Sequence, residues 1–240
     1  MCFRIPNLRK LDLSKNKLKS LERLQTLTTL KSLQCEDNQL VAGSLGSISK
    51  LSSLQTLRVG GNPLGRPPPP PEQARSPLPS KLPKTLKTLA LDRALLSAVP
   101  PPVLTLVKLE TLDLSSNHLA SVPTGISSLQ QLRDLNLDHN VIVSLPDTIG
   151  QLSKLKTLSL RGNKISVQST VFSDKNPQPL PASLFADTPV IDLNLHGNPM
   201  TSTQLNEFDG FSKFLERRQK IKTKDLYGGA LTNLEVCGLE

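Results

Sequence analysis

One eleven-residue pattern, L-x-x-L-x-L-x-x-N-x-L, recurs eight times and restricts the fold of this chain more than any other feature of its sequence. The copies begin at Leu8, Leu30, Leu54, Leu86, Leu109, Leu132, Leu155 and Val190. Successive copies start 22, 24, 32, 23, 23, 23 and 35 residues apart, so the unit has about 23 residues and two intervals carry insertions. A chain with such a period stacks its repeats, and each repeat packs mainly against its neighbours.

The pattern itself has a direct physical explanation. In the L-x-L segment, side chains alternate between the two faces of a short strand, so the leucines at the fourth and sixth positions point inward. The ninth position lies where the chain turns, and an asparagine there can bond backbone groups of its own turn and of the neighbouring coil. The copies place Asn16, Asn38, Asn62, Asn117, Asn140, Asn163 and Asn198 at this position, and the fourth copy has Ala94 instead. We therefore expect a ladder of scaffold asparagines, with the least regular stacking at Ala94.

The segments between the copies predict the other side of each coil. Leu145 and Pro146 precede Ile149 and Leu152, and this short apolar spacing with proline favours extended or 3₁₀ structure. Aromatic residues make up only 3% of the chain, so leucine must fill a thin, layered core. The sequence predicts an α/β solenoid, a horseshoe with a parallel concave sheet of short strands, an extended or 3₁₀ convex side and a C-terminal capping helix.

The chain divides into a repeat region, a cap and a tail. Residues 1–200 hold the eight repeats, with a polyproline insertion at 65–83 and a polar insertion at 166–179, residues 201–224 form the expected capping helix and residues 225–240 the tail. Within the cap, Leu205, Phe208, Phe211 and Phe214 recur at three- and four-residue spacing and give the helix one apolar face. We expect this face to cover the last coil, because solenoids need capped ends.

Two further features bear on partners. The five consecutive prolines Pro67–Pro71 favour a polyproline II conformation. This segment is either a tolerated loop or a ligand for SH3-, WW- or profilin-type domains. At the other end of the repeats, only Phe3 and Ile5 are available to cover the first coil. Either the protein begins further upstream, or this edge meets a partner.

The third, fifth, seventh and eighth positions of each copy should face the concave side of the sheet. The candidate partner-binding residues at these positions are Asp12, Gln34, Glu36, Arg58, Asp92, Asp113, Asn136, Asp138, His139, Ser159, Arg161, Asn194 and His196. Across all four positions eight acids stand against five bases, so this face is mildly acidic although the formal net charge of the chain is +9. Nucleic-acid readers place basic residues on their contact surface, so this balance argues against nucleic acid. A ladder of eight strands is roughly 40 Å long, which suits a protein partner better than a small molecule.

The positive charge gathers instead at strand edges and on the capping helix. The helix carries a basic patch of Lys213, Arg217, Arg218, Lys220, Lys222 and Lys224. Such a run is either a solvated helix face or a contact for an acidic partner, an anionic membrane surface or RNA.

Catalytic and metal chemistry find little support. His139 and His196 face the concave side two repeats apart, roughly 10 Å by the strand spacing, which is too far for them to share a metal ion as neighbouring ligands. Cys35 occupies an inward leucine position and is expected in the core. No nucleophile elbow, phosphate loop or metal-binding motif is present, so we expect no enzyme, no cofactor and no metal site.

Several sequence features indicate where in the cell this protein is located. The cysteines are odd in number and widely spaced, no N-x-[ST] acceptor occurs, and the first residues lack the apolar stretch of a signal peptide. No run is long enough to span a membrane. These features favour the cytoplasm, with the nucleus as the alternative.

The repeat resembles the leucine-rich-repeat superfamily from Leu8 to about Lys224. The L-P-x-x-I halves look like those of plant intracellular Ras-group-related repeat proteins. The ending FDGFSKFLERRQKIKTK is similar to that of the small repeat-only proteins typified by leucine-rich repeat-containing protein fifty-seven and its plant relatives. The polyproline insertion, the bare N-terminal coil and the tail depart from that pattern.

That resemblance and the open sheet together predict a non-catalytic intracellular adaptor that binds a partner protein on its concave face. One alternative is a regulatory subunit in a phosphatase or small-GTPase pathway, by analogy of fold alone. Another is binding to an anionic surface, a membrane or RNA, through the basic capping helix.

Overall fold

The computed structural model describes residues 7–66, 76–167, 178–225 and 237–239. The chain forms two compact units, residues 1–119 and residues 120–240. Of the expected insertions at 65–83 and 166–179 and the tail after 225, residues 67–75, 168–177, 226–236 and 240 lie outside the described residues. Pro67–Pro71, Phe3 and Ile5 also lie outside them, so their proposed roles stay predictions. Among the described residues, no helix is long and apolar enough to cross a membrane.

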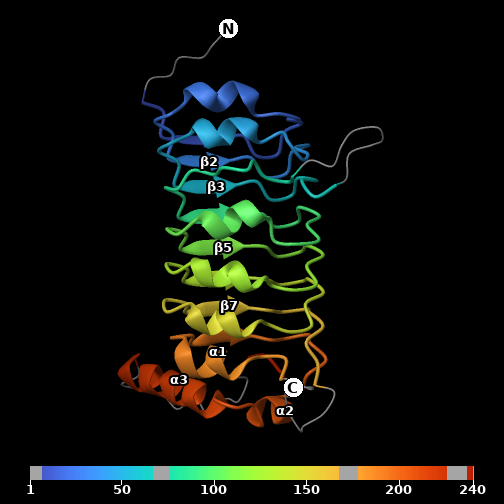
Figure 1. Ribbon diagram of the computed structural model, residues 1–240, viewed down its shortest axis with the longest axis vertical. Helices are drawn as coiled ribbons and strands as arrows, with labels where there is room; N and C mark the ends of the chain where they lie inside the picture. The colour runs from blue at the N-terminus through green and yellow to red at the C-terminus, as the bar shows by residue number, and fades with distance from the viewer. Residues whose placement is uncertain (1–6, 67–75, 168–177, 226–236, 240) are drawn as a thin grey trace. The chain divides into compact units, whose positions relative to one another are not determined.

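The first unit is a ladder of short parallel strands (Figure 1). Its strands are β1 (Lys10–Asp12), β2 (Ser32–Gln34), β3 (Thr56–Arg58), β4 (Thr88–Ala90) and β5 (Thr111–Asp113). Each strand covers the third to fifth positions of the sequence pattern, and within the unit neighbouring strands pair in register from β1 to β5. The central leucines of β2 to β5 are fully buried, whereas Leu11 of β1 is half-buried. The other wall of this unit consists of the 3₁₀ helices η1 (Glu22–Thr26), η2 (Gly46–Lys50) and η3 (Pro101–Thr105).

The second unit repeats this construction and then ends in helices. Its strands β6 (Asp134–Asn136), β7 (Thr157–Ser159) and β8 (Asp192–Asn194) pair in parallel and in register. Opposite them lie the 3₁₀ helices η4 (Thr124–Ser128) and η5 (Asp147–Gln151) and the α-helix α1 (Ala182–Asp187). Each of these three begins after a proline in extended conformation, because the proline ring holds φ near the value that the turn into the helix requires. Both units thus have the predicted architecture, with α1 as a short α-helix where the sequence predicted extended or 3₁₀ structure.

The cap differs from the single helix expected over residues 201–224. It contains α2 (Ser202–Asn206) and α3 (Phe211–Asp225), separated by a turn at Gly210, whose φ of +81° is unfavourable for other residues. Thr201 and Gln204 close a capping box at the start of α2. Phe185 of α1 contacts Phe211 and Phe214 of α3 edge-on, with ring centroids 5.4 Å and 6.1 Å away. The apolar face of α3 therefore packs on α1, as expected of a cap.

The asparagine ladder forms as predicted. Asn62 is fully buried, and its Nδ2 donates to the carbonyl oxygens of Cys35 and Val59 at 2.8 Å and 2.9 Å. Its Oδ1 accepts the N–H of Leu40 in the preceding coil at 2.9 Å. Asn38, Asn117, Asn163 and Asn198 also bond their own turn and the preceding coil.

The irregularity expected at Ala94 is absent from the strands. Strand β4 pairs in register with both β3 and β5. The carbonyl oxygen of Ala94 accepts the N–H of Gly65, and the N–H of Leu64 donates within its own turn to Asn62. Backbone groups thus replace the missing side-chain amide, because the chain folds back locally before the polyproline insertion begins.

The eighth position of the pattern has a property that the sequence analysis missed. All eight copies place a residue there with φ between +49° and +73°. Those residues are Lys15, Asp37, Gly61, Arg93, Ser116, His139, Gly162 and Gly197. Non-glycine residues rarely adopt this left-handed conformation. The three glycines in the column are the sequence signal that could have revealed it.

The C-terminal segment 237–239 takes the place of a further strand beside β8. Within the repeats, the residue at the sixth position donates its N–H to the carbonyl at the fifth position of the next copy, as Leu160 does to Asn194. In the last copy, Leu195 donates in the same way to the carbonyl oxygen of Cys237, at 2.7 Å. The edge of β8 is therefore covered at this point by the tail of the chain.

Candidate functional site

The strand face is the set of side chains at the third, fifth, seventh and eighth positions of the repeats. In the first unit it includes Asp12, Gln34, Glu36, Arg58, Asp92 and Asp113, and in the second Asn136, Asp138, His139, Ser159, Arg161, Asn194 and His196. The in-register pairing of the strands aligns these side chains in rows within each unit. The candidate residues thus form two sets, one per unit, and each set shares one face of its sheet.

The side chains of several fifth-position residues also accept a backbone hydrogen bond at the ends of their strands. Asp113 accepts the N–H of Ser115 through Oδ1 at 2.9 Å, and Asn136 accepts the N–H of Asp138 at 3.0 Å. Asp12 and Asn194 make the same bond to the residue two positions on. These Asx turns hold the side chain close to the backbone. The hydrogen bond from Ser14 lowers the pKa of the Asp12 carboxyl below its ordinary value.

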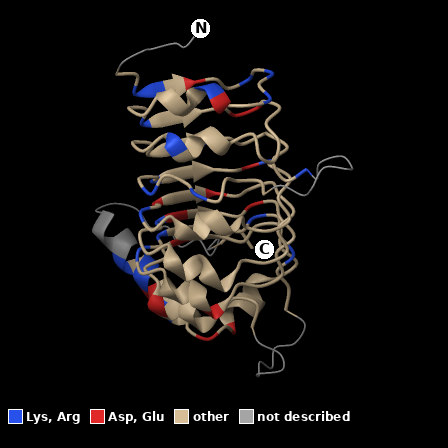
Figure 2. Ribbon diagram, turned by 45° about the horizontal axis from the view of Figure 1, so that its top comes forward, with Lys and Arg blue, Asp and Glu red and all other residues tan. Residues whose placement is uncertain are grey.

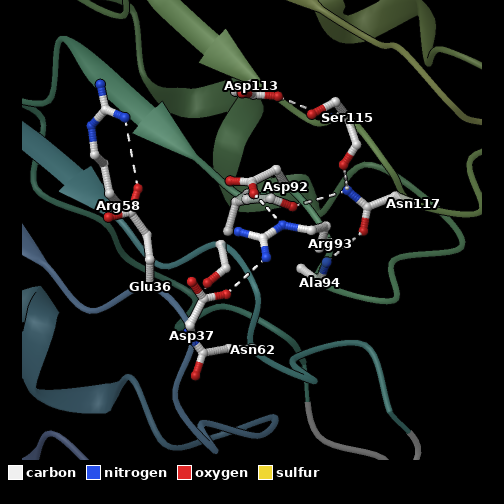
Figure 3. Close-up of polar contacts among 12 residues, drawn as sticks. Glu36, Asp37, Arg58, Asn62, Asp92, Arg93, Ala94, Asp113, Ser115 and Asn117 are labelled. Atoms are coloured by element: carbon white, nitrogen blue, oxygen red, sulfur yellow. Dashed lines mark hydrogen bonds and ion pairs between the residues drawn. The ribbon is translucent and has the colours of Figure 1, made fainter. Parts of the chain in front are cut away.

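Five charged side chains on the strand face of the first unit form ion pairs and make up the charged cluster of this face (Figure 3). Arg58 of β3 lies 3.7 Å from a carboxylate oxygen of Glu36 in the preceding coil. Arg93 donates through Nε to Asp92 at 3.0 Å and through Nη1 to Asp37 at 2.8 Å. These hydrogen bonds, first that to Asp92, raise the pKa of the Arg93 guanidinium above its ordinary value. Because the side chains remain partly exposed, each pair adds less than about 1 kcal/mol to stability, and their main effect is to orient the charges.

The pair of Arg93 and Asp37 spans a complete coil. Their copies are two repeats apart, and the copy between them has glycine at both the seventh and eighth positions. A Cβ atom on Gly61 would overlap the carboxylate of Asp37, and one on Gly60 would overlap that of Asp92. The glycine pair therefore leaves the space in which the two carboxylates meet the guanidinium.

Replacing Gly61 by alanine should lower the free energy of unfolding by about 2 kcal/mol, because alanine at φ +66° is strained and its Cβ displaces Asp37. Gly46→Ala is the matched control, since a Cβ there meets nothing within 4 Å. Its effect should stay within about 0.5 kcal/mol. Urea denaturation of both variants checks this, and equal losses would contradict the assigned role of Gly61.

In the second unit, a hydrogen bond between a side chain and the backbone joins neighbouring coils at the strand face. Asp138 accepts the N–H of Arg161 through Oδ1 at 2.7 Å, which links neighbouring coils. His139 adopts the left-handed conformation, and its ring lies over Gly162, where a Cβ would come 2.7 Å from Nδ1. Ser159, like Gln34 in the first unit, is half-buried. Among the described residues, no three His, Cys, Asp or Glu side chains gather in a way that could hold a metal ion.

Lys and Arg residues lie along the capping helix α3 (Figure 2). The described residues of the basic patch differ in how far their side chains are exposed. Lys213 and Lys220 are exposed. Arg217 is half-buried, its Nε donates to the carbonyl oxygen of Val190 at 3.4 Å, and burial lowers its pKa. The guanidinium of Arg218 lies 5.9 Å from the ring centroid of Phe214. Both arginines thus pack toward the body of the unit, and the side chains of Lys222 and Lys224 lie outside the described ones.

The two described cysteines are buried free thiols. Burial raises the pKa of Cys35 to about 12, and burial likewise raises that of Cys237 to about 12. At about pH 8 the reactive thiolate should be roughly one part in ten thousand. We predict that iodoacetamide modifies both at least about 100-fold more slowly in the folded protein than in guanidinium chloride. Peptide mass spectrometry measures each site, and a native rate equal to the denatured rate would contradict this burial.

Comparison with known proteins agrees with the architecture. A leucine-rich-repeat family model matches residues 84–142 and 107–165, and a second one matches residues 7–27. No curated protein sequence matches the chain. Internalin C2 from Listeria monocytogenes has a similar structure at 24% identity, with a TM-score of 0.61 over 84% of this chain and 78% of internalin C2.

Two other solved structures are similar over most of this chain but only part of their own length. A leucine-rich-repeat protein from Leptospira interrogans, LIC12759, is 25% identical with a TM-score of 0.53, and the match covers 88% of this chain and 59% of that one. The plant peptide hormone receptor RGFR1 in complex with RGF2 is 26% identical with a TM-score of 0.54, over 81% and 33% of the two chains. The repeat pattern, the stacked coils and these matches show that the chain is a leucine-rich-repeat protein.

Proposed function

We propose that this protein is a non-catalytic adaptor that binds a partner protein on its strand face. The observation that carries the proposal is the row of charged side chains in the first unit, which Asx turns and ion pairs hold in defined directions. A surface with oriented side chains loses less conformational entropy when it binds. Leucine-rich-repeat proteins typically mediate protein–protein interaction, and the similar plant receptor is in complex with RGF2.

The charges on the strand face favour a partner surface that carries both acidic and basic side chains. In the first unit, the four strand-face positions carry five acids and four bases. The cluster already pairs Arg58 with Glu36, and Arg93 with both Asp37 and Asp92. Asp12 and Asp113 are acidic residues of the strand face outside that cluster. Basic side chains of a partner would complement their charge.

We place this adaptor in the cytoplasm. The buried free thiols Cys35 and Cys237 support that location, because a reducing compartment preserves unpaired cysteines. Membrane or RNA binding through the capping helix receives less support. Phe211 and Phe214 on its apolar face are buried, so that face is not free to enter a lipid surface.

Site-specific photo-crosslinking tests the proposed surface. A benzophenone amino acid would replace Arg58 or Ser159 on the strand face, and Lys50 of η2 or Gln151 of η5 on the opposite wall as exposed controls. We expect discrete crosslinked products in cells from Arg58, Ser159 or both, and none of the same size from the two controls. The same products from Lys50 and Gln151 would place binding elsewhere.

A further inference from the structure

Unit 2 contains a hollow of about 370 Å³ beside its last strand. Asp192 and Asn194 of β8 line it together with His196, Arg161 of the preceding coil, Arg218 of α3 and the main chain at 237–238. Its volume is at the small end for ligand sites, so it suits one or two side chains better than a cofactor.

The tail of the chain builds one wall of this hollow. The carbonyl oxygen of Cys237 accepts the N–H of Leu195, and the carbonyl oxygen of Gly238 lies 3.0 Å from Nδ1 of His196. Because a carbonyl only accepts, Nδ1 of His196 carries the hydrogen in this contact. A Cβ on Gly238 would come 2.9 Å from Cβ of His196, so glycine permits this close approach. The wall is thus a fitted contact between the tail and the strand face.

Two arginines give the lining of the hollow its positive charge. Arg161 projects from the strand face, and no described residue forms an ion pair or a side-chain hydrogen bond with its guanidinium. Arg218 also lacks an ion pair among the described residues, and the buried ring of Phe214 supports its guanidinium. Asp192 is the one carboxylate among the lining residues. With both arginines and this aspartate charged, the lining has a net charge of +1.

We propose that this hollow receives a carboxylate of the partner protein, held by the guanidinium groups of Arg161 and Arg218. Arginine forms strong charge-assisted hydrogen bonds with carboxylates, often through two nitrogens. One carboxylate neutralises the lining, whereas a phosphate dianion would leave an excess negative charge beside Asp192. The inference rests on the proposed function, because the hollow lies within the strand face and would select the acidic residue of a bound segment.

The carboxylate could come from an acidic side chain or from a chain terminus, and short probes separate these sources. The first is an acetylated and amidated Gly-Gly-Glu-Gly-Gly peptide, and the second has glutamine in place of glutamate. The third is acetylated pentaglycine with a free C-terminus, and the fourth is inorganic phosphate. Titration of the isotope-labelled full chain, followed by amide NMR signals of Leu193 to His196, reports occupancy of the hollow.

We expect the glutamate peptide, the free-terminus peptide or both to shift these signals with saturation, and the glutamine peptide to leave them in place. Arg161→Gln should weaken binding at least about fivefold, because a charge-assisted contact is lost. Arg218→Gln should act in the same direction. Arg133→Gln, an exposed arginine of the same unit outside the hollow, is the control and should leave the affinity unchanged.

Three results would overturn the assignment. They are equal shifts with the glutamine peptide, equal weakening by Arg133→Gln, and saturable binding of phosphate alone. These probes do not require the natural partner. A failed titration alongside strand-face crosslinks would therefore remove the carboxylate site only, whereas carboxylate binding without any strand-face crosslink would count against the adaptor function.

Discussion

Replacing Asn62 by alanine is expected to lower the free energy of unfolding by about 3 kcal/mol. The side chain of Asn62 is fully buried and bonds four backbone groups in the two coils that it joins, at Cys35, Val59, Gly60 and Leu40. Alanine would leave these groups buried without partners, and each such group costs about 1–3 kcal/mol before the structure relaxes. Urea denaturation followed by circular dichroism measures the loss.

The chain supplies a matched control at the same position of the pattern. Asn16 is exposed and, among the described residues, bonds only carbonyl oxygens of its own turn, at Leu13 and Ser14. Water can replace those bonds, so Asn16→Ala should cost less than about 1 kcal/mol. Equal effects of the two substitutions would mean that the ladder does not join the coils.

Phe185→Ala is expected to cost about 4 kcal/mol. Its ring is fully buried and contacts the rings of Phe208, Phe211 and Phe214, so alanine would leave a cavity between α1 and the capping helices. Because repeats contact mainly their neighbours, the damage should concentrate in the second unit. Hydrogen exchange should show lost protection in α1, α3 and β8, with protection in β2 and β3 retained.

Two further substitutions serve as controls for Phe185→Ala. Phe185→Leu keeps most of the buried volume and should cost about 1.5 kcal/mol. Val143→Ala removes methyl groups from a side chain that is 56% exposed in the same unit, and it should change stability by less than about 0.5 kcal/mol. Uniform loss of protection across both units after Phe185→Ala would contradict this prediction, because it would show that the cap also stabilises the first unit.

The period of the sequence was sufficient to predict the strands, their parallel order and the asparagine ladder. Those features depend on residues a fixed distance apart, so one copy such as Leu109 to Leu119 contains nearly all the information needed. From the second copy on, the leucines of the pattern are buried, and the asparagines bond neighbouring turns, because each coil packs against the next one.

Other features depend on contacts between residues whose spacing in the sequence does not follow the repeat. The ion pair of Arg93 and Asp37 joins residues 56 positions apart across a coil with two glycines. The contact of the tail with Leu195 joins residues that no repeat relates. The Asx turns at Asp113 and Asn136 have a sequence signal of their own, since Asp or Asn stands two positions before a polar residue in four copies, but the leucine pattern does not contain it.

The central claim is that strand-face side chains bind the partner while the remainder of each coil supports them. Its most direct test is the affinity of a crosslinked partner, measured by calorimetry with two charge-matched variants. The strand-face variant combines Arg58→Gln with Asp113→Asn, which removes both charges and keeps an Oδ1 for the Asx turn, as in Asn136. The control combines Lys50→Gln with Asp147→Asn in the 3₁₀ helices of the opposite wall. We predict at least about tenfold weaker binding for the strand-face variant and unchanged binding for the control; equal affinity of both variants would contradict the claim.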